Sequence, residues 1–267
     1  MRIQLAPSPA GAGPGHSLST FLVDGVLAID AGGLGMAWPP EQLAKIEHVF
    51  ITHSHIDHLA GLAIFLDTVY QLGPPPTIHA LPATLESMRE DLFNDRLFPD
   101  FVRLSQNISP FLHLAEVHPD KPVQAGRHTL TAVLMAHPVP TVNYLIDDGD
   151  LVVALLTDTL LLPTVFARLA ATPRLAAVFL ECAFPQTQAR LAANSGHLTP
   201  AKFGEAARIF PTEIPIYAIH IKPRYYHEVV TELKKLSLPN FRGVAEPGKV
   251  IRVRRPRKRP LTNREES

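Results

Sequence analysis

The residues best suited to chemistry lie in one short run, Thr52-His53-Ser54-His55-Ile56-Asp57-His58. The run has the pattern H-x-H-x-D-H and follows an apolar stretch at 47–51 that predicts a buried strand ending in a loop. In an extended chain, histidines two residues apart share a side and can bind one ion, while Asp57 and His58 begin a helix and turn toward a second ion. Neutral imidazoles suit zinc, manganese or iron, and a carboxylate suits harder ions. The run therefore predicts a metal site.

Six consecutive residues cannot complete two coordination shells, so further ligands must come from elsewhere in the chain. Three candidates each follow a predicted strand: His137 after 128–135, Asp158 after the apolar run 151–156, and His220 after 216–219. Strand ends are where α/β proteins commonly present functional groups. Taken singly, these residues could be a surface histidine, a helix cap and a packing residue. Together with the H-x-H-x-D-H run, they are predicted ligands.

Two hairpins and several helices are predicted around these residues. The runs 19–23 and 26–30 flank Asp24-Gly25, and the runs 143–147 and 151–156 flank Asp148-Gly149, dipeptides typical of type I′ turns. Further strands are expected at 128–135, 176–182, 215–221 and 249–254, and helices at 59–71, 84–94, 163–171, 200–209 and 224–236. Strands with interspersed helices and no repeat predict an α/β protein whose sheets are mostly antiparallel.

The composition excludes several other classes of protein. With 267 residues, of which 46% are hydrophobic and 19% charged, the chain can bury a sizeable core, and no internal linker divides it. One cysteine excludes a disulfide framework and a cysteine-based zinc finger, and the cytoplasm is the default compartment. No run reaches the roughly 18 apolar residues of a membrane helix, and the first residues lack the apolar core of a secretory signal. We therefore expect no membrane partner.

Charge is unevenly distributed, although the formal net charge is zero. Residues 249–267 hold eight of the 25 basic and two of the 25 acidic residues, which leaves 17 basic and 23 acidic residues, a net charge of −6, on the first 248. We expect one folded domain over 1–253 and a basic, flexible tail over 254–267. Only this tail offers a surface for nucleic acid, and a homodimer is left open.

The ligand pattern resembles the metallo-β-lactamase superfamily over most of residues 17–253. The similarity consists of the H-x-H-x-D-H run, the isolated His137, Asp158 in a Thr-Asp-Thr setting, and the late His220. It implies an αββα sandwich, two sheets flanked by helices, with a binuclear metal site at one edge of a hydrolase domain at 1–253. It also implies the two ligand sets: His53, His55 and His137 for one ion, Asp57, His58 and His220 for the other, and Asp158 bridging. The resemblance favours two zinc ions, with manganese or iron as alternatives.

Two further segments are similar to the class II 3′,5′-cyclic-nucleotide phosphodiesterases of that superfamily. They are Glu181 to Pro185 followed by Ser195-Gly196-His197-Leu198-Thr199-Pro200, and Ile219-His220-Ile221-Lys222-Pro223. This resemblance implies hydrolysis of cyclic AMP or cyclic GMP to the 5′-nucleoside monophosphate, by attack of a metal-bridging hydroxide on phosphorus. A small-molecule cyclic nucleotide is thus the expected partner. The identity of the base is left open.

Within these segments, His197 is the candidate for protonating the O3′ leaving group, and Glu181 is the candidate for orienting His197. His197 could instead bond locally, and Glu181 could be a structural carboxylate near Arg174 or Arg190. Lys222 could contact a phosphate oxygen. The predicted catalytic set is Asp57, Asp158, His197 and Glu181.

Two other functions compete with cyclic-nucleotide hydrolysis. The transfer-RNA 3′-endonuclease branch of the superfamily has a similar Glu and His-x-Thr pair, so an RNA-processing nuclease is the first alternative. A long arm or basic exosite would favour it, and this chain offers only its basic tail. The second alternative is a metal-binding sensor without catalysis, against which the complete ligand set argues.

Overall fold

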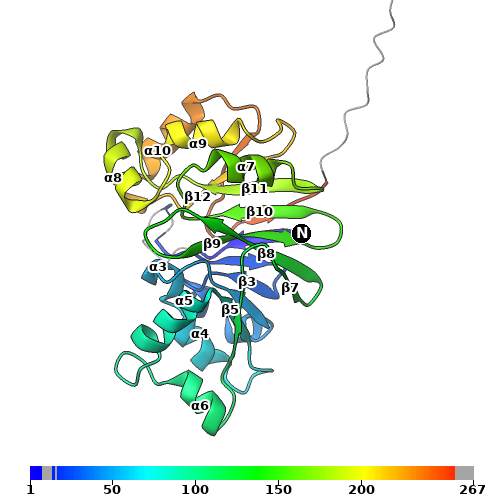
Figure 1. Ribbon diagram of the computed structural model, residues 1–267, viewed down its shortest axis with the longest axis vertical. Helices are drawn as coiled ribbons and strands as arrows, with labels where there is room; N and C mark the ends of the chain where they lie inside the picture. Colours follow the sequence, from blue (N-terminus) through cyan, green and yellow to red (C-terminus); the bar gives the residue numbers. More distant parts are fainter. Residues whose placement is uncertain (8–13, 16, 256–267) are drawn as a thin grey trace, which may run out of the picture.

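The protein is described by a computed structural model that covers residues 1–7, 14–15 and 17–255. Within these residues, two seven-stranded sheets pack face to face and helices cover the outer face of each (Figure 1). The αββα sandwich expected from the sequence is therefore confirmed. None of the helices in these ranges has the length and apolar character of a membrane span. Most of the predicted tail, residues 256–267, lies outside the described residues.

The first sheet has the strand order β14-β1-β2-β3-β4-β5-β6. Its strands are β1 (Arg2–Leu5), β2 (Phe21–Val23), β3 (Leu27–Ile29), β4 (His48–Phe50), β5 (Thr77–Ala80), β6 (His113–Glu116) and β14 (Val250–Arg252). Its outer face packs on α1 (Leu34–Ala37), α2 (Pro40–Leu43), α3 (Ile56–Leu59), α4 (Leu62–Val69), α5 (Pro82–Ser87), a π-helical turn (Met88–Leu92) and α6 (Phe101–Asn107). These helices form the lower layer in Figure 1.

The second sheet has the strand order β13-β12-β11-β10-β9-β8-β7. Its strands are β7 (Pro122–Ala125), β8 (His128–Met135), β9 (Thr141–Asp147), β10 (Val152–Leu156), β11 (Leu175–Glu181), β12 (Ile216–Ile219) and β13 (Phe241–Val244). Its outer face packs on α7 (Pro163–Ala170), α9 (Pro200–Ala207) and α10 (Tyr226–Lys235). Helix α8 (Ala189–Ser195) and 3₁₀ turns at Gln186–Gln188 and Pro223–Tyr225 complete the connections.

Both sheets are mixed, so the prediction of mostly antiparallel sheets is wrong. In each sheet, three neighbouring strand pairs are antiparallel and three are parallel. Strands joined by a short turn pair antiparallel, whereas a strand that returns through a helix pairs in parallel, as β10 and β11 do around α7. Parallel strands end at one edge of their sheet, and that edge can gather side chains that are far apart in sequence.

Both predicted hairpins form, but their turns differ. Asp24 and Gly25 have φ angles of 50° and 82°, as a type I′ turn requires. The second hairpin is a correction: β9 and β10 are joined by four residues, 148–151, and Gly149 has a φ of 89° while Asp148 is not among the residues with positive φ. Oδ1 of Asp148 accepts hydrogen bonds from the two backbone N–H groups at 150 and 151 (3.0 and 2.9 Å), which stabilises this longer loop.

One of the apolar clusters of the described residues lies between the two sheets. It contains Phe21, Phe50, Tyr144 and Phe179, which are at most 3% exposed. The Tyr144 hydroxyl donates to the carbonyl of Ile51 at 2.9 Å, where the chain leaves β4. The core thereby fixes the start of the segment that carries the H-x-H-x-D-H run.

Candidate metal centre

The predicted ligands come together where strands of both sheets end. The H-x-H-x-D-H run follows β4, while His137 and His220 follow β8 and β12, and Asp158 follows β10. His220 has a φ of 57°, a backbone conformation that a histidine adopts at a cost and that turns the chain sharply at the end of β12. Seven side chains separated by up to 167 positions thus occupy one edge of the sandwich; they are His53, His55, Asp57, His58, His137, Asp158 and His220.

Three imidazoles and one carboxylate form the first group: His53, His55, His137 and Asp158. Nδ1 of His55 lies 3.0 Å from Nε2 of His53 and 3.1 Å from Nε2 of His137. Oδ2 of Asp158 lies 3.5 and 3.6 Å from the same two Nε2 atoms. Ligands about 2.0–2.1 Å from a tetrahedral zinc ion are about 3.3 Å apart, so these spacings fit one ion.

The second group consists of Asp57, His58 and His220. Oδ2 of Asp57 lies 3.9 Å from Nε2 of His58 and 3.9 Å from Nε2 of His220. Asp158 faces this group as well, with Oδ2 3.5 Å from Nε2 of His58 and Oδ1 3.1 Å from Nε2 of His220. The Asp158 carboxylate is therefore placed between the two groups, as a bridging ligand would be.

The outer nitrogens of the imidazoles are held by hydrogen-bond acceptors. Nδ1 of His58 lies 2.6 Å from Oδ2 of Asp30, and Nδ1 of His137 lies 3.1 Å from the carbonyl oxygen of Gly196. Because these partners accept hydrogen bonds, each Nδ1 carries a proton, and each Nε2 faces the centre as the atom that would bind an ion once it is unprotonated. This tautomer is the one a metal ion needs.

The protein itself leaves two atoms of the centre unsatisfied. Among the described residues, Nε2 of His58 and Oδ1 of Asp158 are buried side-chain atoms without a hydrogen-bond partner. Such orphaned atoms are costly, and two of them in one cluster of lone pairs are explained by a cation. The donor set therefore fits the divalent ions that the fold implies.

Burial and charge set the protonation of the cluster. Burial lowers the pKa of His53 and of His220 well below the ordinary value, and lowers that of His137 to about 4. Burial raises the pKa of Asp158, but the neighbouring His220 and His58 outweigh it and hold that pKa well below its usual range. Most of the imidazoles are thus neutral around an ionised carboxylate, which is the protonation that metal binding requires.

Asp30 is a functional residue that the sequence analysis missed. It is fully buried at the end of β3, has a φ of 58°, and accepts hydrogen bonds from the Thr52 backbone N–H (2.8 Å) as well as from His58. Burial lowers the pKa of His58, but Asp30 and Asp158 raise it well above the ordinary value. The only signal in the sequence was a lone aspartate after a strand, ahead of Gly32.

His197 and Glu181 lie beside the first group. Nδ1 of His197 donates to Oε1 of Glu181 at 3.0 Å, and Nε2 of His197 lies 3.9 Å from Oδ2 of Asp158. Glu181 is fully buried and also accepts from the backbone N–H groups of residues 159, 183 and 198. The alternative partner Arg174 pairs with Asp147 instead, at 2.5 Å.

This arrangement gives His197 two chemical roles. Burial lowers the pKa of His197, but Glu181 outweighs it and raises that pKa above the ordinary value. His197 also belongs, with Asp158 and His220, to a third set of converging ligand atoms. The geometry therefore allows His197 to hold a proton for a leaving group or to approach an ion.

Gly196 lies directly against His137. A Cβ built on Gly196 would be 2.7 Å from Nδ1 of His137, and the residue has a φ of 75°. Glycine is thus required here for two reasons, space and backbone conformation. The glycine lets the carbonyl oxygen of residue 196 reach the imidazole.

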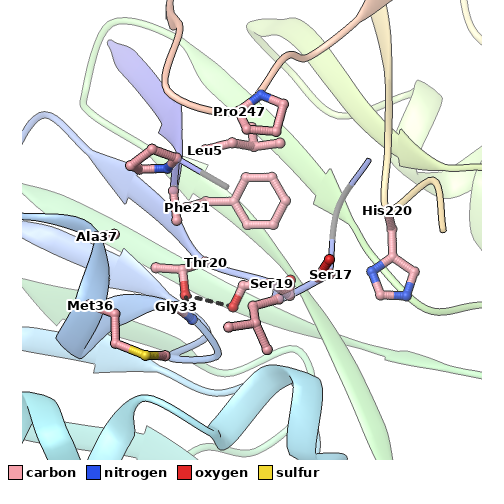
Figure 2. Close-up of a pocket in the computed structure, with 13 residues that line it drawn as sticks. Leu5, Ser17, Ser19, Thr20, Phe21, Gly33, Met36, Ala37, His220 and Pro247 are labelled. Carbon is pink, nitrogen blue, oxygen red and sulfur yellow. Dashed lines mark hydrogen bonds between the residues drawn. The ribbon is translucent and has the colours of Figure 1, made fainter. Parts of the chain in front are cut away.

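Two cavities flank the centre. One of about 300 Å³ reaches His220 and is lined mainly by apolar side chains, among them Leu5, Phe21, Met36 and Pro247 (Figure 2). Its Thr20 hydroxyl donates to the Ser19 carbonyl at 2.6 Å, and no Lys, Arg, Asp or Glu side chain lines the described part of this cavity. The other, of about 420 Å³, lies between α7, α8 and α9 and reaches His197. A substrate at the centre can therefore extend in two directions.

The fold is similar to that of solved structures. The structure of unliganded yeast PDE1 superposes with a TM-score of 0.75 at 17% identity, covering 93% of this chain and 98% of that one. The short form of human tRNase Z gives a TM-score of 0.67 at 15% identity, covering 95% of this chain and 100% of that one. At such identities the similarity concerns the fold.

Sequence comparisons find two kinds of relative. A 62-residue segment, 22% of this chain and 17% of the relative, is 35% identical to 3′,5′-cyclic-nucleotide phosphodiesterase 1 of Saccharomyces cerevisiae. A 162-residue segment, 55% of this chain and 46% of the relative, is 30% identical to ribonuclease Z of Thermoplasma acidophilum. The chain thus matches less than half the length of either relative.

The family itself is recognised over most of the chain. The description "Beta-lactamase superfamily domain" matches residues 20–221, a range that contains every side chain of both ligand groups. The range also contains His197 and Glu181. The fold, the converging ligands and this match agree, and the chain belongs to the metallo-β-lactamase superfamily of hydrolase-type proteins.

Proposed function

We propose that this protein hydrolyses phosphodiesters at a centre of two divalent ions, and that its substrate is a 3′,5′-cyclic nucleotide, AMP or GMP, converted to the 5′-monophosphate. The observation that carries the proposal is the convergence of both ligand groups and His197 on the single carboxylate of Asp158. The first group would hold one ion, the second group the other, and Asp158 would bridge them. Zinc suits the imidazole-rich set, and manganese or iron are alternatives.

When bound, two such ions lower the pKa of a shared water and neutralise negative charge on the phosphoryl oxygens. The chain's own part is to position the reactants and to handle the proton. A water oxygen forms the new bond to phosphorus and releases one proton to the solvent, the bond from phosphorus to O3′ breaks, and His197 gives the proton from Nε2 to the departing O3′. His197 then regains a proton from the solvent. Glu181 is a positioning residue, because its carboxylate holds Nδ1 of His197 and leaves Nε2 facing Asp158.

Two observations support a small cyclic substrate. The cavity beside His220 is apolar, and its described lining carries no lysine or arginine for the further phosphates of an RNA chain. A nucleobase is uncharged and flat, and such a group suits an apolar cavity at the small end of the usual ligand-pocket range of roughly 300–1,000 Å³. The matching segment of the yeast cyclic-nucleotide phosphodiesterase points the same way.

An RNA-processing nuclease is the second candidate, favoured by the longer match to ribonuclease Z. It would use the same ions and the same His197–Glu181 pair. Its substrate would have to lie outside the apolar cavity beside His220. A metal-binding sensor without catalysis is the third candidate.

The test is a product analysis with metal-loaded protein. Incubation with 3′,5′-cyclic AMP and cyclic GMP should yield 5′-monophosphates, separated from 3′-monophosphates by chromatography, and a chelator should abolish the reaction. Precursor transfer RNA is assayed in parallel. Cleavage of RNA without turnover of cyclic nucleotides would favour the nuclease instead. No turnover of phosphodiesters, thioesters or lactams by a protein holding two ions would favour the sensor.

A further inference from the structure

The feature that the proposed chemistry does not use is a lysine inside the second group. Lys222 follows β12, and its Nζ lies 3.0 Å from Oδ2 of Asp57 and 3.0 Å from Nε2 of His220. The side chains of Lys222 and Asp57 are 28% and 25% exposed, so water screens this ion pair only in part. Two of the three side chains of the second group thus already contact a positive charge.

The distances show that the ammonium and an ion cannot share this position. Oδ2 of Asp57 and Nε2 of His220 are 3.9 Å apart, and Nζ of Lys222 is 3.0 Å from both. An ion bonded to both atoms at about 2.1 Å would lie within about 3 Å of Nζ, on whichever side of their connecting line it sat. Two positive charges at that separation repel strongly, so Lys222 must move away before an ion binds both atoms.

The first group differs in this respect. The described residues place no lysine or arginine in hydrogen-bond or ion-pair contact with His53, His55 or His137. Its imidazole nitrogens lie 3.0 and 3.1 Å from one another without an ammonium or guanidinium group of the described residues between them. The two positions are therefore chemically unequal, although they share Asp158.

We propose that Lys222 is a built-in competitor for the second ion, so that the two metal positions fill one after the other. The inference rests on the proposed two-ion centre and concerns its occupancy. At low free metal, the first group holds an ion and the Lys222 ammonium pairs with Asp57 and His220. At higher free metal, the second ion displaces the ammonium, and the bridged centre is complete. The supply of free metal thereby sets the fraction of molecules with two ions.

The experiment measures metal binding without any substrate. Metal-free wild-type protein and the variants Lys222→Leu and Lys222→Arg are titrated with zinc chloride by calorimetry, and bound zinc is counted after equilibrium dialysis. Lys235→Leu is the matched control, because Lys235 is an exposed lysine in the last turn of α10 and lines neither cavity beside the centre.

The expected wild-type result is a tight first step and a weaker second step. In Lys222→Leu, the second dissociation constant should fall about tenfold, since an ion pair and a like-charge repulsion are removed together, and the first should not change. Lys222→Arg and Lys235→Leu should retain the weak second step. The unchanged first step also reports that each variant is folded.

The results that would contradict the inference differ from those that would contradict the metal centre or the proposed function. An unchanged or weaker second step in Lys222→Leu would overturn the inference, because Lys222 would then support the second position rather than compete for it. Equal affinity of both steps in the wild-type protein would also overturn it. Binding of no zinc at all would refute the metal centre itself, whereas zinc binding as expected without phosphodiester turnover would refute the proposed function and leave the inference standing.

Discussion

Strand β8 has a histidine near each end, and each histidine lies beside a buried carboxylate. At the start of the strand, Nε2 of His128 and a guanidinium N–H of Arg127 donate to Oδ2 of Asp24, at 2.9 and 2.5 Å. Beyond the other end, Nε2 of His137 lies 3.6 Å from Oδ2 of Asp158, without a hydrogen bond. We call these the Asp24 cluster (Asp24, Arg2, Arg127, His128) and the Asp158 cluster (Asp158 with both ligand groups).

The two clusters differ in whether the N–H groups around the carboxylate donate to it or away from it. In the Asp24 cluster every neighbour donates to the carboxylate: burial raises the pKa of Asp24, but the hydrogen bonds from His128, the Arg2 backbone and Arg127 bring it well below the usual range. In the Asp158 cluster, the outer imidazole nitrogens donate away from the carboxylate, as His58 does to Asp30. The same residue types thus make an ion-pair network around Asp24 and a set of converging ligand atoms around Asp158.

The largest expected effect follows from removing the carboxylate that both ligand groups share. Asp158→Asn keeps the shape and removes the charge, so we expect bound metal to fall from two ions to at most one and turnover to fall by about a thousandfold or more. Metal content and the hydrolysis of cyclic AMP measure this. Asp24→Asn is the matched control and should keep both ions. Loss of metal in both variants would show that the two clusters do not differ in metal binding.

A smaller effect is expected at His197, whose outer nitrogen donates to Glu181. His197→Ala should lower kcat for cyclic AMP by about 10²–10³-fold, because a proton donor to the leaving group is lost. Metal content should stay the same. A diester with a nitrophenolate leaving group needs no protonation, so its turnover should change little. Loss of metal in this variant would instead make His197 a ligand.

Nδ1 of His58, which faces away from Asp158, donates its proton to Asp30. Asp30→Asn replaces the carboxylate that holds Nδ1 of His58, and we expect the affinity for the second ion to fall about 10–100-fold while the first ion is retained. Zinc titration of the metal-free variant measures both steps. Because Asp30 also accepts from Thr52, thermal unfolding is recorded as well. Equal weakening of both ions would show that Asp30 supports the loop as a whole.

The smallest effect is expected in the Asp24 cluster and concerns stability alone. Asp24→Asn should lower the free energy of unfolding by about 1–2 kcal/mol at pH 7, a modest value because Arg2 and Arg127 are exposed. The folded-state pKa of Asp24 lies below its ordinary value of 3.8, so its contribution is fully present above about pH 4 and is lost as the pH falls. Urea unfolding at pH 7, 4 and 2.5 should therefore show the gap between the two proteins closing. A gap that widens on acidification would contradict this assignment.

The sequence predicts the layered fold and several elements closely. The expected strand at 128–135 is β8 to the residue, and the helices expected from 163 and 200 begin at Pro163 and Pro200, where a missing N–H costs nothing. Strand direction was predicted wrongly although an intervening helix was expected, as at 163–171 between the strands at 151–156 and 176–182. A strand that returns through a helix pairs in parallel, as β10 and β11 do. Edge strands such as β7 (Pro122–Ala125) and β13 (Phe241–Val244) were missed because they are short and partly exposed, without apolar alternation.

Some residues of the candidate site could be predicted from the sequence and others could not. The structure brings together the side chains that the sequence pointed to. The signals were the spacing of the H-x-H-x-D-H run and the strand-end positions of His137, Asp158 and His220. The roles of these residues as ligands remain a prediction. Asp30 and the contacts of Lys222 were not predictable in this way. Each depends on a partner 28 or 165 positions away, and only the folded chain brings those partners together.

Gly196 has a consequence for how this protein tolerates change. The residue offers no side chain, yet any side chain there would meet Nδ1 of His137 and strain a backbone with a φ of 75°. In a survey of all single substitutions, position 196 should therefore resemble a ligand position, with every replacement depleted under selection for metal-dependent activity. The neighbouring exposed Asn194 should accept most replacements. The positions that accept no substitution would then include a residue that leaves space for an imidazole as well as the histidines themselves.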